Sequence, residues 1–350
     1  MRVWLTRGFS LRAIGAAMRD ALPGHEVLVS DAGPRDGAAR DDRIDHGPPA
    51  VVEPDPIDAD AYLDFVRDAV RARDVDVVVP TRRAALLDAA RERVGCRVET
   101  AASAPTLDLL HDKLAFAAAL AGHPLLATTL PVRSADELES GLEAFAAGRF
   151  PACVKPARGV NGVGFLAFTD RARLAQLAEP ELRETRPDTF AAALREAEAR
   201  DGTCPPHVLM EFLPGLETSI DALAWRGQLL GHAARTKRSA EVQELTTDHR
   251  LAPHVAGLVE RFALHGLVSV QFRLDARGEP RLLEINPRPA GGCTFAEAAG
   301  CGLVASWARL LVGEIGPGDV RVPRVEAVLR RCELVTAGPA AAIGTTRHAA

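Results

Sequence analysis

Three short stretches of the sequence carry side chains whose types and spacing suit phosphate and metal chemistry. The first is VKPARGVNGVGF, in which Lys155 ends an apolar run and three glycines follow: Gly159, Gly162 and Gly164. Glycines let backbone N–H groups surround an anion, and a lysine ammonium adds a point charge. The spacing is not that of a P-loop, and a glycine-rich turn beside a surface lysine is also common as plain structure.

The second stretch, LEINPRPAGG, places Glu284, Asn286 and Arg288 at alternate positions. In an extended strand such residues share one face. Carboxylate and amide oxygens suit Mg²⁺, and arginine suits a phosphoryl group. Gln271 lies in the preceding predicted strand, VSVQFRLD, and faces this set if the connector ARGE forms a hairpin. Ordinary solvent-facing sheets also alternate polar residues, but the prolines that flank Arg288 are unusual there.

The third stretch, MEFLPGLETSID, places Glu211 at the end of a predicted strand and Glu217 beyond a Pro-Gly turn. A strand that ends in a turn offers free backbone groups to an adenine edge, and a carboxylate six residues later suits ribose hydroxyls. Two solvated glutamates would give the same pattern.

Strands and helices alternate along the first hundred residues, beginning with a short apolar strand, an amphipathic helix and a second strand. This order predicts a parallel, doubly wound sheet over residues 1–104. A polar, Pro/Gly-rich stretch over residues 31–60 interrupts it and is typical of a surface excursion. The pattern pauses at AASAP, where we place the domain boundary.

The second half of the sequence predicts an α+β region built on antiparallel strands. An apolar pair of strands encloses the glycine-rich stretch, and further strands follow over HVLMEFL, TSIDALAW, QLLGHAART, LVSVQFRLD and PRLLEIN. We therefore expect a second domain over residues 105–335. The Ala/Gly/Thr-rich residues 336–350 read as a flexible tail.

Composition argues against several functional classes. Lys plus Arg (42) nearly balance Asp plus Glu (47), so the net charge of −5 provides no basic field for nucleic acid. Arginines interrupt the apolar N-terminal stretch, so neither a signal peptide nor a membrane span is predicted, and a cytoplasmic location is the default. The six cysteines form no CxxC pair and read as buried or incidental thiols.

In their order along the chain, VKPARGVNGVGF, MEFLPGLETSID and VQFRLDARGEPRLLEINPR together resemble the ATP-grasp superfamily, particularly its carbamoyl-phosphate-synthetase-like branch. The resemblance covers about residues 105–335 and implies a two-lobed domain, with a smaller glycine-loop lobe over about 125–212 and a C-terminal metal-binding lobe over about 213–335. It implies a Mg·ATP-dependent ligase that phosphorylates a carboxylate and passes the acyl group to an amine-type nucleophile.

The resemblance also implies roles for individual residues. Lys113 and Lys155 match phosphate-binding residues, and the loop Gly159–Gly164 matches the cover over the phosphates. Glu211 and the Leu213 backbone match the adenine hinge, and Glu217 the ribose-binding acid. The metal-binding set, expected to hold two Mg²⁺ ions with Mn²⁺ as a substitute, matches Gln271, Glu284 and Asn286. Arg288 matches the arginine that steadies the transferred phosphoryl group.

Some positions depart from the family pattern. Many relatives carry an acid where Gln271 stands, and a neutral ligand weakens the second metal site. Arg82 and Arg83 follow Pro80 where relatives often carry an acid. They suit either an anionic substrate or a solvated helix start, and the helix start is the simpler interpretation. Arg235 and Lys237 suit contact with either the phosphates or an acidic substrate. Residues 241–249 resemble a variable loop over the acceptor site.

Two other functions compete with the ligase. A catalytically silent ATP-grasp protein that binds nucleotide as a sensor or scaffold is the alternative from another class. A dinucleotide-binding oxidoreductase is disfavoured because the first turn, LTRGFSLRAIG, lacks the required glycine spacing. The sequence does not name the carboxylate or its acceptor; family analogy favours an amino acid or small peptide, and base rates favour a homodimer.

Overall fold

A computed structural model describes residues 1–8, 11–32, 51–54, 57–148, 151–159, 162–171, 182–239 and 241–330. Cys332, the tail 336–350 and most of the predicted excursion over 31–60 lie outside these residues. No helix in the described ranges is long and apolar enough to cross a membrane. The five cysteines within the ranges are free thiols.

The chain divides into two compact units, each assembled from separated segments. The first unit comprises Met1–Ala104, Ile220–Ser269 and Pro287–Ala350, and the second comprises Pro105–Ser219 and Val270–Asn286. The domain limits expected from the sequence stay a prediction, because these units are defined by contacts and not by chain order.

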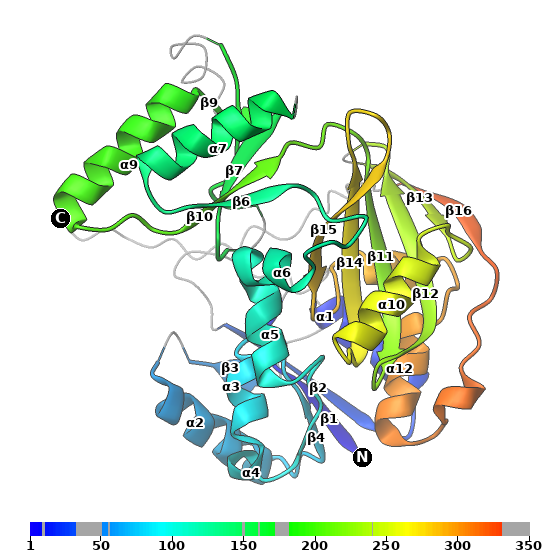
Figure 1. Cartoon of the computed structure of the whole chain (residues 1–350). Helices are drawn as coiled ribbons and strands as arrows, with labels where there is room; N and C mark the ends of the chain where they lie inside the picture. Colours follow the sequence, from blue (N-terminus) through cyan, green and yellow to red (C-terminus); the bar gives the residue numbers. More distant parts are fainter. Residues whose placement is uncertain are drawn as a thin grey trace, which may run out of the picture. The chain divides into compact units, whose positions relative to one another are not determined.

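The first unit contains a five-stranded parallel sheet in the order β3-β2-β1-β4-β5 (Figure 1). Its strands are β1 (Arg2–Leu5), β2 (Glu26–Ala32), β3 (Val51–Glu53), β4 (Val77–Val79) and β5 (Arg97–Val98). The helices of this N-terminal region are α1 (Leu11–Ala21), α2 (Ala59–Ala72), α3 (Ala84–Ala89) and α4 (Arg91–Val94). The crossover order β3-β2-β1-β4-β5 confirms the predicted doubly wound sheet.

Alternate residues of β1 face opposite sides of this sheet, because successive strand side chains point in opposite directions. Val3 and Leu5 pack in a core cluster with Ile14 of α1. Trp4 packs in a separate cluster with Val66 of α2. Each face of the sheet is therefore covered by a helix, as the continuous apolar strands required.

The second unit contains a sheet in the order β6-β10-β7-β8-β9. Its strands are β6 (Thr129–Val132), β7 (Ala152–Pro156), β8 (Leu166–Phe168), β9 (Glu184–Thr185) and β10 (His207–Glu211). The pairs β6–β10, β10–β7 and β7–β8 are antiparallel, and β8–β9 is parallel. Helices α7 (Ala135–Ala147) and α9 (Pro187–Asp201) pack in one core cluster with this sheet (Figure 1). Helices α5 (Ala104–His111) and α6 (Lys113–Ala119) precede it in the chain.

A third sheet has the order β15-β14-β11-β12-β13-β16. Its strands are β11 (Glu217–Trp225), β12 (Gln228–Lys237), β13 (Val242–Thr246), β14 (Gly266–Leu274), β15 (Pro280–Asn286) and β16 (Glu326–Arg330). The remaining elements are α10 (Ala252–Arg261), α11 (Cys293–Ala298), α12 (Leu303–Val312) and the 3₁₀ turn η2 (Pro317–Asp319). The antiparallel sheets expected in the second half are confirmed.

The segment 241–249 differs from the sequence expectation. We expected a variable loop, whereas residues 242–246 form β13, which pairs antiparallel with both β12 and β16. Leu245 is buried in the core of the first unit, and this single apolar anchor in a polar segment is too weak a pattern to predict a strand. Pairing partners from distant parts of the chain decide the structure here.

Candidate nucleotide site and a recess beside Arg288

Four of the predicted site residues line one cavity in the second unit. Lys113, Gly159, Glu284 and Asn286 surround a cavity of about 30 Å³. They come from α6, the glycine-rich loop and β15, so residues separated by more than a hundred positions in the sequence meet here. A cation, a glycine backbone and two oxygen-bearing side chains around one space are what a metal-bound phosphate requires.

Lys113 is held in place by the residue before it. The Asp112 carboxylate caps α6 by accepting hydrogen bonds from the N–H groups of Leu114 (3.0 Å) and Ala115 (3.1 Å). Arg158 Nε donates to the same carboxylate at 3.1 Å. The Lys113 backbone N–H donates to Ala157 O at 2.9 Å, and its Nζ donates to Gly159 O at 3.2 Å. The start of α6 is therefore fastened to the root of the glycine-rich loop.

The charge of Lys113 is sensitive to pH. Burial lowers its pKa from the ordinary value of 10.5, with Lys155 acting in the same direction and Glu284 opposing both. A bound phosphate favours the charged lysine, so affinity falls as pH rises through the pKa of the free site. We expect ADP affinity, measured by calorimetry over a pH series, to begin falling below pH 10.5. The variant Lys113→Arg stays protonated and should flatten this decline; an unchanged profile would remove Lys113 from the phosphate site.

The glycine-rich loop needs glycine at the position where it turns back toward β8. Gly164 has φ +73°, and a Cβ atom there would lie 2.6 Å from Pro156 Cγ. Gly162 has φ +66°, and its carbonyl accepts a hydrogen bond from Arg183 Nη1 at 3.0 Å. Both positions thus favour glycine for conformational reasons. Val160 and Asn161 lie outside the described residues.

Lys155 lies in β7 beside aromatic and apolar side chains that could pack against a nucleotide base. Its Nζ sits 5.6 Å from the centroid of the Phe165 ring and 3.6 Å from Met210 Sδ. Phe165 is in turn stacked with Phe212, with 6.4 Å between ring centroids. Apolar and aromatic atoms next to a lysine are suited to a nucleotide, which has an apolar base and an anionic chain.

The predicted hinge runs from Glu211 to Glu217. Glu211 ends β10 and is buried, and burial raises its pKa, although Arg281 opposes that shift. Leu213 is also buried, whereas Glu217 is half-buried at the start of β11 and accepts a 3.4 Å hydrogen bond from Ser219 Oγ. Gly215 is fastened to β14, since its N–H donates to Leu274 O (3.0 Å) and its carbonyl accepts from Arg273 Nε (2.9 Å).

Gly215 tests whether this hinge positions the nucleotide. A Cβ atom there would lie 2.5 Å from Leu274 Cβ and 2.9 Å from Leu274 O, so Gly215→Ala must push the hinge away from β14. We expect a loss of about 1–3 kcal/mol in stability from overpacking, and at least about tenfold weaker ATP binding. Gly257→Ala is the matched control, because that exposed glycine of α10 has no atom within 4 Å of the added Cβ among the described residues. Equal ATP affinity in both variants would contradict the hinge assignment.

The predicted metal-binding side chains lie on adjacent strands. Glu284 and Asn286 share one face of β15, and Asn286 Nδ2 donates to Glu284 Oε1 at 2.8 Å. Gln271 is half-exposed on β14, the neighbouring strand in the sheet. All three offer the hard oxygen donors that Mg²⁺ prefers, so the set fits that ion chemically. It contains one acid, and no group of three His, Cys, Asp or Glu side chains suited to a metal occurs within the described ranges.

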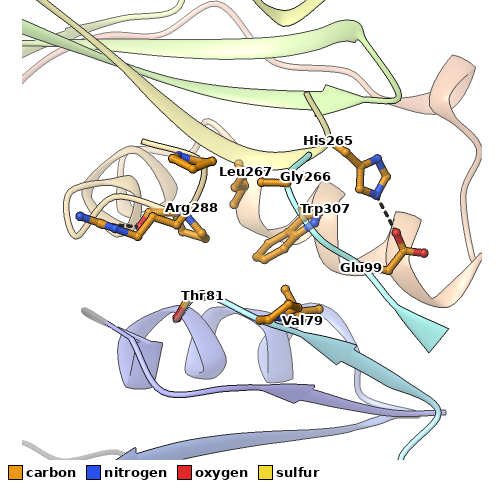
Figure 2. Close-up of a pocket in the computed structure, with 12 residues that line it drawn as sticks. Val79, Thr81, Glu99, His265, Gly266, Leu267, Arg288 and Trp307 are labelled. Atoms are coloured by element: carbon orange, nitrogen blue, oxygen red, sulfur yellow. Dashed lines mark hydrogen bonds and ion pairs between the residues drawn. The ribbon is translucent and has the colours of Figure 1, made fainter. Parts of the chain in front are cut away.

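Arg288 lies beyond the end of β15 and belongs to the first unit. The alternation predicted from the sequence therefore holds for Glu284 and Asn286 but stops before the arginine, since the strand ends at Asn286. Arg288 donates from Nη1 to Pro289 O at 3.2 Å. It also helps to line a recess of about 20 Å³ in the first unit, together with Thr81, Glu99, Gly266 and Trp307 (Figure 2).

The two predicted contacts on β12 differ in their surroundings. Arg235 is 3% exposed and makes two hydrogen bonds to the Asp221 carboxylate, from Nε at 2.7 Å and from Nη2 at 3.1 Å. Its Nη1 donates to Gln243 Oε1 at 2.9 Å. Lys237, at the end of the same strand, is half-buried. These contacts favour a structural role for Arg235 over substrate contact.

Sequence reasoning missed the recess beside Arg288. Trp307 looks like an ordinary core residue of an amphipathic helix, and Glu99 and His265 stand in unremarkable polar positions. The glycine before the β14 apolar run is the one sequence feature that hints at a close approach there.

Comparison with known proteins identifies the class to which this fold belongs. Residues 203–334 match a family described as "ATP-grasp in the biosynthetic pathway with Ter operon". No curated protein sequence matches the chain. The resemblance to ATP-grasp proteins is confirmed by this match and by the solved structures that share the fold.

Three of those structures illustrate the fold. An L-amino acid ligase from Bacillus licheniformis is 16% identical with a TM-score of 0.60, and the match covers 92% of this chain and 77% of the ligase chain. The N5-carboxyaminoimidazole synthetase from Staphylococcus aureus is 14% identical with a TM-score of 0.62, covering 93% and 81%. A biotin carboxylase from Campylobacter jejuni is 12% identical with a TM-score of 0.63, covering 91% and 73%. The chain therefore has the ATP-grasp fold.

Proposed function

We propose that this protein is a Mg·ATP-dependent ligase that activates a small carboxylate as an acyl phosphate and joins it to an amine. The observation that carries the proposal is the meeting of Lys113, Gly159, Glu284 and Asn286 around one cavity of the second unit. A fold shared with ligases supports the reaction class, and the side chains around this cavity suit its nucleotide.

In this proposal the nucleotide lies along the second unit. The adenine meets the hinge at Glu211 and Leu213, and Glu217 takes the ribose hydroxyls. Lys113 and Lys155 neutralise the phosphates, and the glycine-rich loop covers them with backbone N–H groups. Glu284 and Asn286, together with Gln271, would hold Mg²⁺, which would neutralise further phosphate charge; one carboxylate together with nucleotide phosphates is a usual way to bind this ion.

The chemistry consists of two displacements. A carboxylate oxygen attacks the γ-phosphorus, the bond from that phosphorus to the bridging oxygen breaks, and ADP leaves. An amine nitrogen then attacks the acyl carbon, the bond to the phosphate oxygen breaks, and the amine proton passes to the departing phosphate or to water. Lys155 stabilises the charge on the transferred group, a role that the sequence also predicts for Arg288. Neither displacement needs a side chain as a covalent nucleophile.

The carboxylate we favour is an amino acid or small peptide. One of the proteins with this fold is an L-amino acid ligase and another is a D-alanyl-alanine synthetase from Vibrio cholerae. Both are named for amino-acid substrates, which supports this class without selecting a member of it.

The test is ADP release from Mg·ATP across pools of amino acids and other small carboxylates. We expect release that depends on one pool and requires intact Glu284. Nucleotide that binds tightly but yields no ADP with any pool would instead favour the silent sensor.

A further inference from the structure

The recess beside Arg288 contains a hydrogen-bond donor with no acceptor. Trp307 lies on the buried face of α12 and is 3% exposed, and its Nε1 has no partner among the described residues. Buried N–H groups nearly always have a partner, because leaving one without an acceptor costs about 1–3 kcal/mol. This indole N–H therefore points to a group that completes the site.

Space for such a group is kept open by a glycine. Gly266 begins β14 with φ +73°, and a Cβ atom at this position would lie 3.1 Å from Trp307 Nε1. Figure 2 shows the indole between Gly266 and Val79, with its nitrogen on the side of His265 and Glu99. Any larger residue at position 266 would occupy the space next to the donor.

The same recess also presents an acceptor. His265 Nδ1 accepts a 3.3 Å hydrogen bond from the Arg226 N–H, and its Nε2 lies 2.9 Å from Glu99 Oε2. Burial disfavours the charged form of Glu99, but His265 and the nearby arginines outweigh burial and hold its pKa below the ordinary range. Glu99 is therefore a carboxylate that accepts hydrogen bonds.

The size and polarity of the recess restrict its occupant. About 20 Å³ holds one water-sized group. The walls otherwise include apolar side chains such as Val79 and Leu267, and Thr81 Oγ1 already donates to Arg7 O at 2.8 Å. A carboxylate group would face the negative Glu99, and an ammonium would leave the indole N–H without an acceptor. A hydroxyl satisfies both, since it accepts from Trp307 and donates to Glu99.

The recess lies where this kind of sheet binds ligands. Val79 ends β4, Pro80 and Thr81 follow it, and Glu99 follows β5, so the recess is at the carboxyl ends of two parallel strands. We propose that the recess binds the hydroxyl group of a small hydroxylated carboxylate, and that Trp307 is the residue that selects it. The inference rests on the proposed ligase function for the use of this carboxylate as substrate, but the binding itself does not require turnover.

The experiment observes the indole N–H directly by proton–nitrogen NMR of the full chain labelled with ¹⁵N-tryptophan. The chain has three tryptophans, and Trp307→Phe identifies one of the three signals by its loss. The probes are three matched pairs in which one member lacks the hydroxyl: L-serine and L-alanine, L-threonine and L-2-aminobutyrate, and L-lactate and propionate. Each is added with and without Mg·ATP analogue.

We expect at least one hydroxylated probe to shift the Trp307 signal while its deoxy partner does not. Trp4 is an internal control, because its Nε1 is also buried with no partner in the described part of the chain but belongs to the core under α2. No shift with any hydroxylated probe, which would mean a structural water only, overturns the proposal. Equal shifts with both members of a pair overturn it as well.

Turnover separates this inference from the ligase proposal. If a hydroxylated carboxylate drives ADP release, Trp307→Phe should lower its kcat/KM relative to its deoxy partner by at least about fivefold, the effect of one lost hydrogen bond. A shifted Trp307 signal without ADP release would refute the ligase and leave the recess assigned. ADP release with an unmoved signal would do the reverse.

Discussion

Replacing Glu284 by alanine is expected to lower ATP turnover at least about 100-fold, since even residues that only support metal ligands cost 10–100-fold when changed. Glu284 is the one acid of the predicted metal set, and it lines the cavity with Lys113. Its loss removes the negative charge that holds Mg²⁺ and leaves the lysine without its opposing charge. The measurement is the rate of ADP release with the activating carboxylate pool.

The fold should survive this change. Glu284 is half-exposed and accepts a hydrogen bond from Asn286, so the free energy of unfolding should fall by no more than about 1 kcal/mol. Glu279→Ala is the matched control, because that glutamate is exposed in the turn of the same hairpin. Turnover retained in Glu284→Ala, or lost equally in Glu279→Ala, would refute the metal assignment.

The second large effect is expected at the buried ion pair in the first unit. Arg235 and Asp221 are 3% and 1% exposed, and their two hydrogen bonds form a bidentate pair. Arg235→Met leaves the Asp221 carboxylate buried without its counter-charge, which costs about 3–5 kcal/mol. Urea unfolding measures the loss.

A double variant distinguishes a structural pair from a substrate contact. Arg235→Met combined with Asp221→Leu removes both charges, so most of the lost stability should return. Gly292→Ala offers an independent test, because its added Cβ would overlap the Arg235 guanidinium. If Arg235 instead binds substrate, Arg235→Lys would raise KM while unfolding stays unchanged, and the double variant would show simple additivity.

The sequence could not distinguish the roles of the two cations on β12. Arg235 and Lys237 alternate along one strand and looked equivalent as cations near an anionic ligand. Their roles differ because Asp221, on the neighbouring strand, lies opposite one of them in a dry interior. Pairing between strands therefore decides which of the two cations forms a buried ion pair.

The same reasoning applies to the recess beside Arg288. Trp307, on α12, provides the hydrogen-bond donor, and Glu99, after β5, provides the acceptor. Gly266, at the start of β14, leaves the space between them open. Each has an ordinary structural explanation within its own segment. Only the packing of α12 against β14 turns a core tryptophan into a donor for which the described residues offer no acceptor.

The sequence by itself determined the doubly wound parallel sheet, the antiparallel second half and the nucleotide-site residues proposed here. These features are local or ordered along the chain: apolar strands alternate with helices, glycines stand where φ is positive, and polar residues alternate on β15. Tertiary structure alone decided that β13 is a strand, that Arg235 is buried against Asp221, and that Trp307 faces an open recess. These outcomes depend on contacts between distant segments, whose free energies of burial and pairing no single stretch of sequence contains.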